Sequence, residues 1–368
     1  MSAEHRVTET AAPAVQRAIP KVEPVAEGRK FTAELLRRTG DKKKDKRSAK
    51  LAAYFQLKIL ADLEALDSNE AGGTKRDVSE IESPRVDTME LAEVTETVAQ
   101  QMEEEPMVDF IVIRDAHRRP VGYANTEVMP LSEDDGSGKP RDATLFVWLV
   151  GVDAVCRGTN AFPVMNEAIM NAALATAKRE NLRITTVSME AGRDVEKKFH
   201  RHWGASGVYM RHTDGTLIEA PYIPPPTSTQ GGIMTEPADD PHSKWLIGYL
   251  DERKTITPEE FLKHADLVYE GYKIERSEGY QGAVENVQAF MRDAVAQICN
   301  GKPLEFIDVN QRRQIEAGEV PDQKILGPKQ FSPFLKRNFP ELHKRFRKIV
   351  KDLKKDYEPG DEESEDES

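Results

Sequence analysis

The chain has 368 residues, of which 38% are hydrophobic and 32% are charged, and its formal net charge is −12. This length suggests two modest domains, and so polar a composition predicts that part of the chain is disordered. The acidic balance argues against nucleic-acid binding by the molecule as a whole, although it leaves room for a local basic patch that binds nucleic acid.

The cysteines and the hydropathy limit the chemistry and the compartment. Cys156 and Cys299 lie far apart, which excludes a disulfide framework and gives no basis for a metal site. The first 30 residues lack the apolar segment of a signal peptide. No run of about 18 apolar residues, the length that crosses a membrane, occurs in the sequence. We therefore expect a cytoplasmic protein that does not associate with membranes.

The N-terminal part is expected to precede the first globular domain. Residues 1–30 show no helical or strand period, which predicts a disordered arm. Residues 31–66 carry apolar positions at helical spacing and 67–83 are polar, so 31–83 is predicted as a helical, basic segment followed by a linker. A basic run inside it is interpreted as a solvated helix face or linker, with a phosphate- or acid-binding arm as the alternative. The run consists of Lys42, Lys43, Lys44, Lys46, Arg47 and Lys50.

Residues 84–214 alternate between helix and strand patterns, which predicts an α/β domain. The strongest strand, Thr144–Val152, is rich in apolar, β-branched and aromatic residues. The helix after it has apolar residues at steps of three and four. The expected elements are a helix at 87–104, strands at 110–113, 121–129 and 144–152, a loop at 132–141, a helix at 163–179, a strand at 183–189, a helix at 192–203 and a strand at 206–211.

The remainder is expected to be a linker, a mainly helical region and an acidic tail. Six prolines between 219 and 241 predict an extended Pro-rich linker over 215–241. Residues 257–260 read Thr-Pro-Glu-Glu, which is typical of a helix start, and 284–298 carry an apolar stripe. Residues 242–355 are therefore predicted to be mainly helical. The carboxylates of 356–368 predict a disordered acidic tail.

A basic amphipathic helix is expected over 340–355, and its role is open. Its lysines and arginines suit a nucleic acid or an acidic partner. The same pattern also fits a helix that docks its apolar stripe on the domain and exposes its lysines to water, or one that folds against the acidic tail.

The stretch Val152–Pro163 joins the strongest strand to the helix that follows. A loop that opens onto a helix N-terminus offers backbone N–H groups and the positive end of the helix dipole. Such a loop is a natural binding site for a pyrophosphate. This one reads Arg157-Gly158-Thr159-Asn160-Ala161-Phe162 before the proline.

This stretch and the order of elements resemble the GNAT superfamily of N-acetyltransferases over residues 84–214. In that family a strand ending in Val is followed by four residues, an Arg-Gly pair, two more spaced glycines and a long helix. The loop amides bind the pyrophosphate of acetyl-coenzyme A. The resemblance implies a mixed central sheet flanked by helices, with acetyl-coenzyme A as the acyl donor. The donor-binding residues that it implies are Val150 and Val152 on the strand and Arg157, Gly158, Thr159, Asn160, Ala161 and Phe162 in the loop.

The sequence departs from the family pattern in the same loop. The two later glycines fall on Asn160 and Phe162. Asn tolerates unusual backbone angles, whereas Phe brings a bulky side chain to the place where the phosphates approach. Pro163 supplies no N–H, although proline is common in the first turn of a helix. An ordinary connection between strand and helix is the alternative interpretation.

Candidate catalytic residues follow from the resemblance and from the chemistry. His200 stands where the family often has a tyrosine that protonates the departing thiolate, and imidazole can do this near neutral pH. A base is also needed to free the attacking amine, and Glu127 and Asp153 are the candidates. The alternatives are that His200 is an ordinary polar helix residue and that both carboxylates only face solvent.

The leading hypothesis is an acyltransferase that moves an acetyl group from acetyl-coenzyme A to an amine. The long arms and the helical region favour a macromolecular acceptor such as a protein. The alternative is a catalytically inactive binding or scaffold protein with a GNAT fold, which the departures in the loop favour and which would suit an oligomer. A nucleic-acid-associated protein that uses the helix at 340–355 is a third hypothesis.

Overall fold

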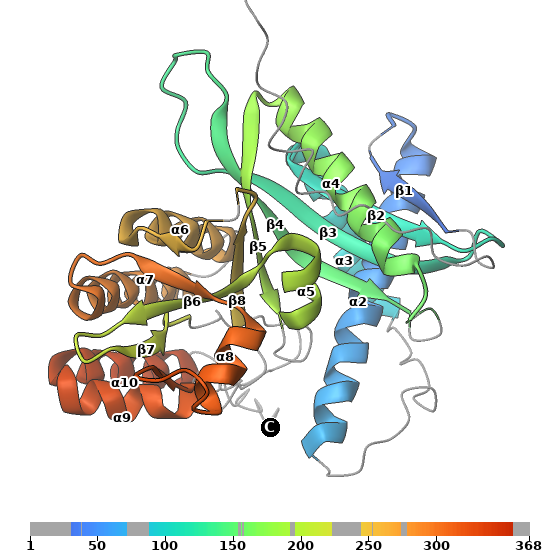
Figure 1. Cartoon of the computed structure of the whole chain (residues 1–368). Coiled ribbons are helices and arrows are strands. Elements are labelled where there is room, and N and C mark those ends of the chain that lie inside the picture. The colour runs from blue at the N-terminus through green and yellow to red at the C-terminus, as the bar shows by residue number, and fades with distance from the viewer. Residues whose placement is uncertain are drawn as a thin grey trace, which may run out of the picture. The chain divides into compact units, whose positions relative to one another are not determined.

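The computed structural model divides the chain into two compact units that meet in sequence between Val187 and Ser188. Figure 1 shows the elements of both units. The predicted arm and acidic tail lie outside the described residues, as does most of the predicted Pro-rich linker, so the predicted domain boundaries stay predictions. The described residues are 31–37, 39–71, 88–153, 156, 158–191, 196–222, 244–251, 253–273 and 278–355.

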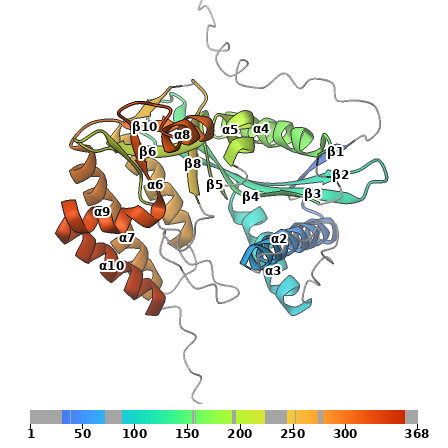
Figure 2. The ribbon, with the colours of Figure 1, turned by 60° about the horizontal axis from the view of Figure 1, so that its bottom comes forward.

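The first unit is built on a sheet in which the strands follow one another in sequence order from β1 to β5. The pairs β1–β2, β2–β3 and β3–β4 are antiparallel. Helix α4 covers one face of this sheet, and α2 and α3 cover the other (Figure 2). The strands are β1 (Thr32–Leu36), β2 (Val108–Arg114), β3 (Pro120–Pro130), β4 (Arg141–Val152) and β5 (Leu182–Ala191), and the helices are α2 (Lys42–Ala71), α3 (Thr88–Glu104) and α4 (Ala161–Arg179).

Small residues bring α2 close to the sheet. Ala49, Ala52 and Ala53 are fully buried, and they pack in one cluster with residues of β2 and β3. Phe55 of the same helix stacks on Tyr123 of β3, with ring centroids 6.2 Å apart. The helical spacing of these residues is the signal that the sequence carries for α2.

The expected helix over residues 31–36 is wrong, because this segment is strand β1. All five residues of β1 pair with β2, from Thr32 opposite Arg114 to Leu36 opposite Phe110. So short an apolar cluster has no period that separates helix from strand. Helix α2 begins only at Lys42, where the Asp41 carboxylate accepts hydrogen bonds from the next backbone N–H groups. The basic run therefore forms the first turns of α2, and its lysines are exposed.

From α3 to β6 the observed order is helix, three strands, helix, strand, helix and strand, as expected. The predicted α/β class is confirmed, with a mixed sheet flanked by helices and a mainly helical region after it. Strand β5 belongs to both units, since Leu182–Val187 lie in the first and Ser188–Ala191 in the second. Among the described residues, none of the helices combines the length and the apolar character that crossing a bilayer requires.

The second unit contains a sheet with the order β8-β6-β10-β9, extended by β7 on β6 and β11 on β7. Helices α5 and α8 lie on one side of this sheet, and α6, α7, α9 and α10 lie on the other (Figure 2). The strands are β6 (Ser206–Arg211), β7 (Thr216–Glu219), β8 (Lys244–Tyr249), β9 (Thr255–Ile256), β10 (Leu304–Ile307) and β11 (Lys324–Leu326), and the helices are α5 (Glu196–Trp203), α6 (Pro258–Lys273), α7 (Glu278–Cys299), α8 (Val309–Glu316), α9 (Pro328–Asn338) and α10 (Pro340–Lys355).

The helices predicted after residue 257 are present, and the strands between them are additional. The predicted helix start is confirmed, since Thr257 and Glu260 each accept a hydrogen bond from the backbone N–H of the other. Helix α10 buries its apolar stripe, and the Phe346 ring centroid lies 5.6 Å from those of Phe290 in α7 and Phe331 in α9. The buried stripe consists of Leu342, Phe346, Ile349 and Val350.

Acid is expected to weaken the second unit through His264 of α6. This side chain is 1% exposed and packs edge-on against Tyr249, and neither ring nitrogen has a hydrogen-bond partner among the described residues. Burial lowers its pKa from 6.5 to about 4, against a smaller opposing effect of Glu260. Below about pH 6.5 the unfolded chain therefore binds a proton at His264, whereas the folded chain does not bind it until about pH 4. The free energy of unfolding should consequently fall by about 3 kcal/mol as the pH is lowered from 6.5 to 4.

Urea denaturation at several pH values between 7 and 4.5 measures this loss, and His264→Leu is the comparison. The leucine variant cannot titrate at this position, so its free energy of unfolding should vary less with pH in this range. An unchanged pH dependence in the variant would assign the acid sensitivity to other groups.

Candidate functional site

Strand β4 is interrupted by a bulge at Trp148. In the register with β3, Asn125 lies opposite Leu149 and Thr126 opposite Val147, which leaves Trp148 as an extra residue. Bulges of this kind bend a strand, redirect a side chain and occur next to active sites. The Trp148 ring packs on Phe146, with centroids 4.4 Å apart.

The redirected indole meets Glu127 of β3, one of the predicted catalytic residues. Trp148 Nε1 donates a hydrogen bond to Glu127 Oε2 over 2.9 Å. Burial raises the pKa of Glu127, the Trp148 hydrogen bond opposes this by favouring the carboxylate, and nearby Glu105 raises the pKa further. The pKa is raised overall, which brings the carboxylate closer to the range in which a general base is effective.

Glu127 and the predicted donor residues of β4 lie on opposite faces of the sheet. Glu127 stands opposite Val108, which packs against the cluster formed by α2 and α3. Val150 and Val152 stand opposite Ala124 and Gly122, whose face is covered by α4. The bulge lies between these two parts of β4.

Close packing at Gly122 explains how α4 approaches this part of the sheet. A Cβ atom at Gly122 would lie 2.8 Å from the Cε of Met165, a buried residue of α4. A side chain at Gly122 would therefore require the end of the flexible Met165 side chain to move.

Hydrogen bonds join the described residues of the connection from β4 to α4. The backbone N–H of Cys156 donates to Asp153 O over 2.8 Å, and the N–H of Thr159 donates to Cys156 O over 3.3 Å. Gly158 is exposed and has a φ of +77°, a conformation that favours glycine. The Asn160 side chain makes no capping hydrogen bond at the start of α4. The predicted residue Arg157 lies outside the described residues.

The first turn of α4 offers fewer ligand contacts than the family pattern implies. Ala161 is fully buried, and its N–H lies 3.3 Å from the Thr159 hydroxyl oxygen. Phe162 is half-buried, and Pro163 has no N–H to donate. Among the described residues of this loop, Gly158 is the exposed one.

Asp153, the second predicted base, forms an ion pair with a lysine of α2. Its Oδ2 lies 2.7 Å from Lys58 Nζ, and the two side chains are 26% and 12% exposed. The ammonium group donates a hydrogen bond to one of its two oxygens. This arrangement ties α2 to the end of β4 and makes Asp153 a weaker candidate for a base than Glu127.

His200 lies in the second unit, on helix α5. Its Nδ1 is 3.0 Å from the Ser206 hydroxyl oxygen, which fixes the orientation of the ring. The same helix holds the stacked pair Phe199 and Trp203, whose ring centroids are 5.4 Å apart. The structure thus groups Glu127, Asp153 and the described donor-binding residues in the first unit and His200 in the second.

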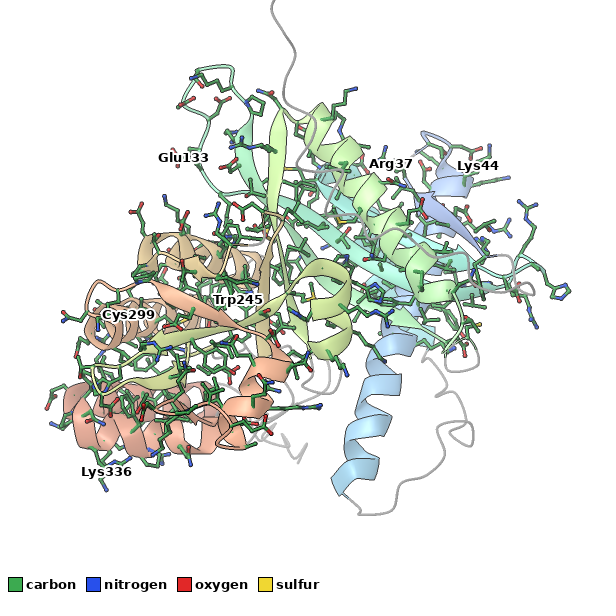
Figure 3. The ribbon with its side chains drawn as sticks, viewed as in Figure 1. Arg37, Lys44, Glu133, Trp245, Cys299 and Lys336 are labelled. Carbon is green, nitrogen blue, oxygen red and sulfur yellow. The ribbon has the colours of Figure 1, made fainter. Side chains whose placement is uncertain are left out.

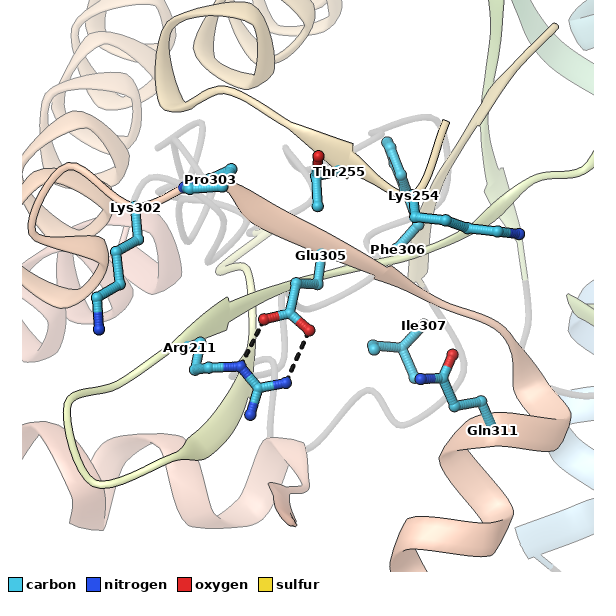
Figure 4. A pocket seen from close by; sticks show the side chains of 9 residues that line it. All are labelled: Arg211, Lys254, Thr255, Lys302, Pro303, Glu305, Phe306, Ile307 and Gln311. Carbon is cyan, nitrogen blue, oxygen red and sulfur yellow. Dashed lines mark hydrogen bonds and ion pairs between the residues drawn. The ribbon is translucent and has the colours of Figure 1, made fainter. Parts of the chain in front are cut away.

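A hollow of about 540 Å³ opens in the second unit (Figure 4). Arg211 and Glu305 lie at its centre and are joined by two hydrogen bonds of 2.5 and 2.7 Å. Lys254 and Lys302 also line it. None of the residues predicted from the sequence as catalytic or donor-binding contributes to this hollow.

No family profile and no curated protein sequence matches the chain. Among solved structures, it is similar to a histone acetyltransferase HPA2 and related acetyltransferase from Corynebacterium glutamicum, with 13% identity, a TM-score of 0.30, and coverage of 59% of this chain and 96% of that chain. A chimera of spermidine N-acetyltransferase SpeG from Vibrio cholerae and hSSAT has 10% identity and a TM-score of 0.29, with 60% and 95% covered. A possible acetyltransferase from Clostridium difficile has 14% identity and a TM-score of 0.27, with 48% and 88% covered. These values are too low to assign an activity, which has to be argued from the residues of this chain.

Proposed function

We propose that the protein is an N-acetyltransferase that moves an acetyl group from acetyl-coenzyme A to an amine. The observation that carries the proposal is the junction of β4 and α4, where a bulged strand leads through a positive-φ glycine into the N-terminus of a long helix. Exposed backbone at a helix N-terminus favours an anion. A Cβ atom at Gly158 would meet nothing within 4 Å, so this turn leaves space for a phosphate.

The reaction requires one base and one acid. The amine nitrogen attacks the acetyl carbonyl carbon, a C–N bond forms, the C–S bond breaks, and the departing thiolate takes up a proton. Glu127 is proposed to accept the proton of the amine, because its raised pKa and its hydrogen bond to Trp148 hold a carboxylate beside the bulge. A general acid must supply the proton to the thiolate, and Asp153 is assigned to the ion pair with Lys58.

The acceptor is proposed to be a primary amine, with a lysine of another protein as the leading class. Val150 and Val152 would line the donor along β4, with Gly158, Thr159, Asn160, Ala161 and Phe162 at the phosphates. Arg157 is part of this proposal on its sequence position. A cytoplasmic location is proposed with it, where acetyl-coenzyme A is available.

One observation favours a second candidate function, an inactive scaffold that keeps the fold. Pro163 removes an N–H from the first turn of α4, and Phe162 brings a large side chain there. Both changes weaken phosphate binding relative to a glycine-rich loop. The scaffold predicts a folded protein that does not bind acetyl-coenzyme A.

Acetyl-coenzyme A is expected to raise the melting temperature of the protein, and Gly158→Trp is expected to abolish the rise. A ligand at about 100 times its Kd adds about 2.7 kcal/mol to the stability of the folded state. For a unit of this size that corresponds to several degrees in thermal denaturation. The indole of the variant would fill the space that the phosphates need.

Gly136→Trp is the matched control for this experiment. Gly136 is exposed, has a φ of +70°, and has no atom within 4 Å of its Cβ position, like Gly158, but it lies in the loop between β3 and β4. The two variants carry a similar backbone strain, so only Gly158→Trp should lose the ligand-induced shift. A well-folded wild-type protein without any shift would support the scaffold instead.

A further inference from the structure

The outer surface of α9 and α10 carries a concentrated positive charge. Residues 328–355 contain ten Lys and Arg against two Asp and Glu, in a chain whose net charge is −12. Most described apolar side chains of both helices are buried, whereas the described basic side chains are exposed, as Figure 3 shows for Lys336. We call this surface the basic face. Its exposed members include Lys336, Arg337, Lys344, Arg347, Lys348 and Lys351.

Much of this charge has no acidic partner. Lys344 pairs with Glu341 over 2.7 Å, and Arg345 pairs with Asp293 of α7. Lys336, Arg337, Lys348 and Lys351 form no ion pair with any described residue. Like charges gathered on one surface repel each other and create a local field that attracts an anion. The basic face therefore needs a counter-charge.

We propose that residues 356–368 of the same chain dock on the basic face. This segment follows Lys355, the last residue of α10, without a break. It contains eight Asp and Glu and no Lys or Arg, so its charge of −8 equals in size the charge of +8 on residues 328–355. Because it is covalently attached, its effective concentration at the face is far higher than that of a free partner.

The composition of the acidic segment allows it to turn back on α10. Pro359-Gly360 is a dipeptide that favours a chain reversal. Within the proposal, a turn there would bring the carboxylates from Asp361 onwards back towards the basic side chains of α10.

Docking has a consequence for other anions. A nucleic acid or an acidic protein would reach the basic face only by displacing the attached segment. Charge pairs at a surface are individually weak and are screened by salt. The docked state should therefore weaken as the ionic strength rises.

Lysine footprinting of the full chain tests the proposal. An amine-reactive reagent is added, and the labelling rate of each lysine is read by mass spectrometry. Replacing the carboxylates of residues 361–367 with their amides, in a chain of unchanged length, should make Lys348 and Lys351 react several-fold faster. Lys42, Lys43 and Lys46 are the internal control, because they form an exposed basic run on α2 and should keep their rates. In about 1 M salt, where the Debye length is about 3 Å, the difference should disappear.

Carbodiimide cross-linking identifies the occupant, because it joins carboxylates and ammonium groups that already form ion pairs. Cross-links between residues 361–367 and the lysines at 344, 348 and 351 are expected in the wild-type chain. They should be lost in K344E/K348E/K351E and kept in the matched variant K42E/K43E/K46E. In a mixture of light and heavy isotope-labelled chains, they should join residues of one copy.

Three results would overturn the proposal. Equal cross-linking to the α2 lysines would mean non-specific attraction. Mixed-isotope cross-links would mean docking on a second copy. Equal affinity of the wild-type and amide-tail chains for a single-stranded oligonucleotide that protects Lys348 and Lys351 would make nucleic acid the occupant.

Discussion

Glu127→Gln is expected to lower kcat for acetyl transfer by about 10²- to 10⁴-fold, the contribution typical of a general base. Glu127 is half-buried, its pKa is raised by burial, and it holds a hydrogen bond from Trp148 beside the bulge of β4. Glutamine preserves the size of the side chain but cannot accept the proton of the amine. The binding of acetyl-coenzyme A should change little, because the variant leaves the junction of β4 and α4 intact.

The measurement is the release of free thiol from acetyl-coenzyme A with the best acceptor from a set of lysine peptides and small amines. Asp135→Asn, in the exposed loop between β3 and β4, is a control for the loss of a carboxylate. A kcat that survives Glu127→Gln but is lost in Asp153→Asn would move the base to Asp153.

Trp148→Phe gives a separate readout for the same site. The Trp148 hydrogen bond lowers the pKa of Glu127, so its removal should raise that pKa further. A base acts in its deprotonated form, and the acidic limb of the pH profile of kcat/KM should therefore move to higher pH. A limb that stays in place would mean that another group titrates there.

Glu196→Leu is expected to destabilise the second unit by about 3–5 kcal/mol, the cost of removing one partner of a buried ion pair. Arg312 then retains the half-exposed Glu316 carboxylate at 3.8 Å. Glu196 of α5 accepts a hydrogen bond of 2.6 Å from Arg312 of α8, and the two side chains are 0% and 9% exposed. Burial lowers the pKa of Arg312, but the Glu196 carboxylate and Tyr209 raise it above its ordinary value overall. Because an arginine side chain is protonated at any pH near neutrality, the guanidinium remains charged when Glu196 is removed. Urea denaturation followed by circular dichroism measures the loss.

Two comparisons separate the pair from general effects. Adding Arg312→Met to Glu196→Leu also removes the buried guanidinium charge. The double variant should therefore regain much of the stability that Glu196→Leu loses. Arg292→Met breaks the exposed pair with Asp266, where the side chains are 50% and 35% exposed, and should cost about 1 kcal/mol or less. Equal losses in Glu196→Leu and Arg292→Met would show that burial does not strengthen the α5–α8 pair.

Long periodic elements could be predicted from the sequence, because each carries its own signal. A run of apolar and β-branched residues predicts strand β4. The helical spacing of the apolar residues predicts α4. Strands β9 and β11 have two and three residues, which is too short for any period. They form because neighbouring strands in the sheet offer unpaired backbone groups for hydrogen bonding. This pairing depends on the tertiary structure, so the local sequence does not predict these two strands.

The candidate site was only partly predictable for a related reason. Glu127 and Gly158 stand out by residue type and position, but the partner of Glu127 depends on the register of β3 and β4. A bulge shifts that register at Trp148, and no local pattern reveals it. Lys58 and Asp153 are 95 positions apart, so their ion pair could not be read from either segment alone.

Strand β5 determines how the molecule can be divided in the laboratory. The boundary between the two units falls inside it, with Leu182–Val187 on one side and Ser188–Ala191 on the other. A fragment that ends at Val187 would lack the last residues of β5. The complementary fragment would begin with those residues, Ser188–Ala191, cut off from the rest of the strand. Attempts to express either half alone should therefore keep the whole of β5 in both fragments.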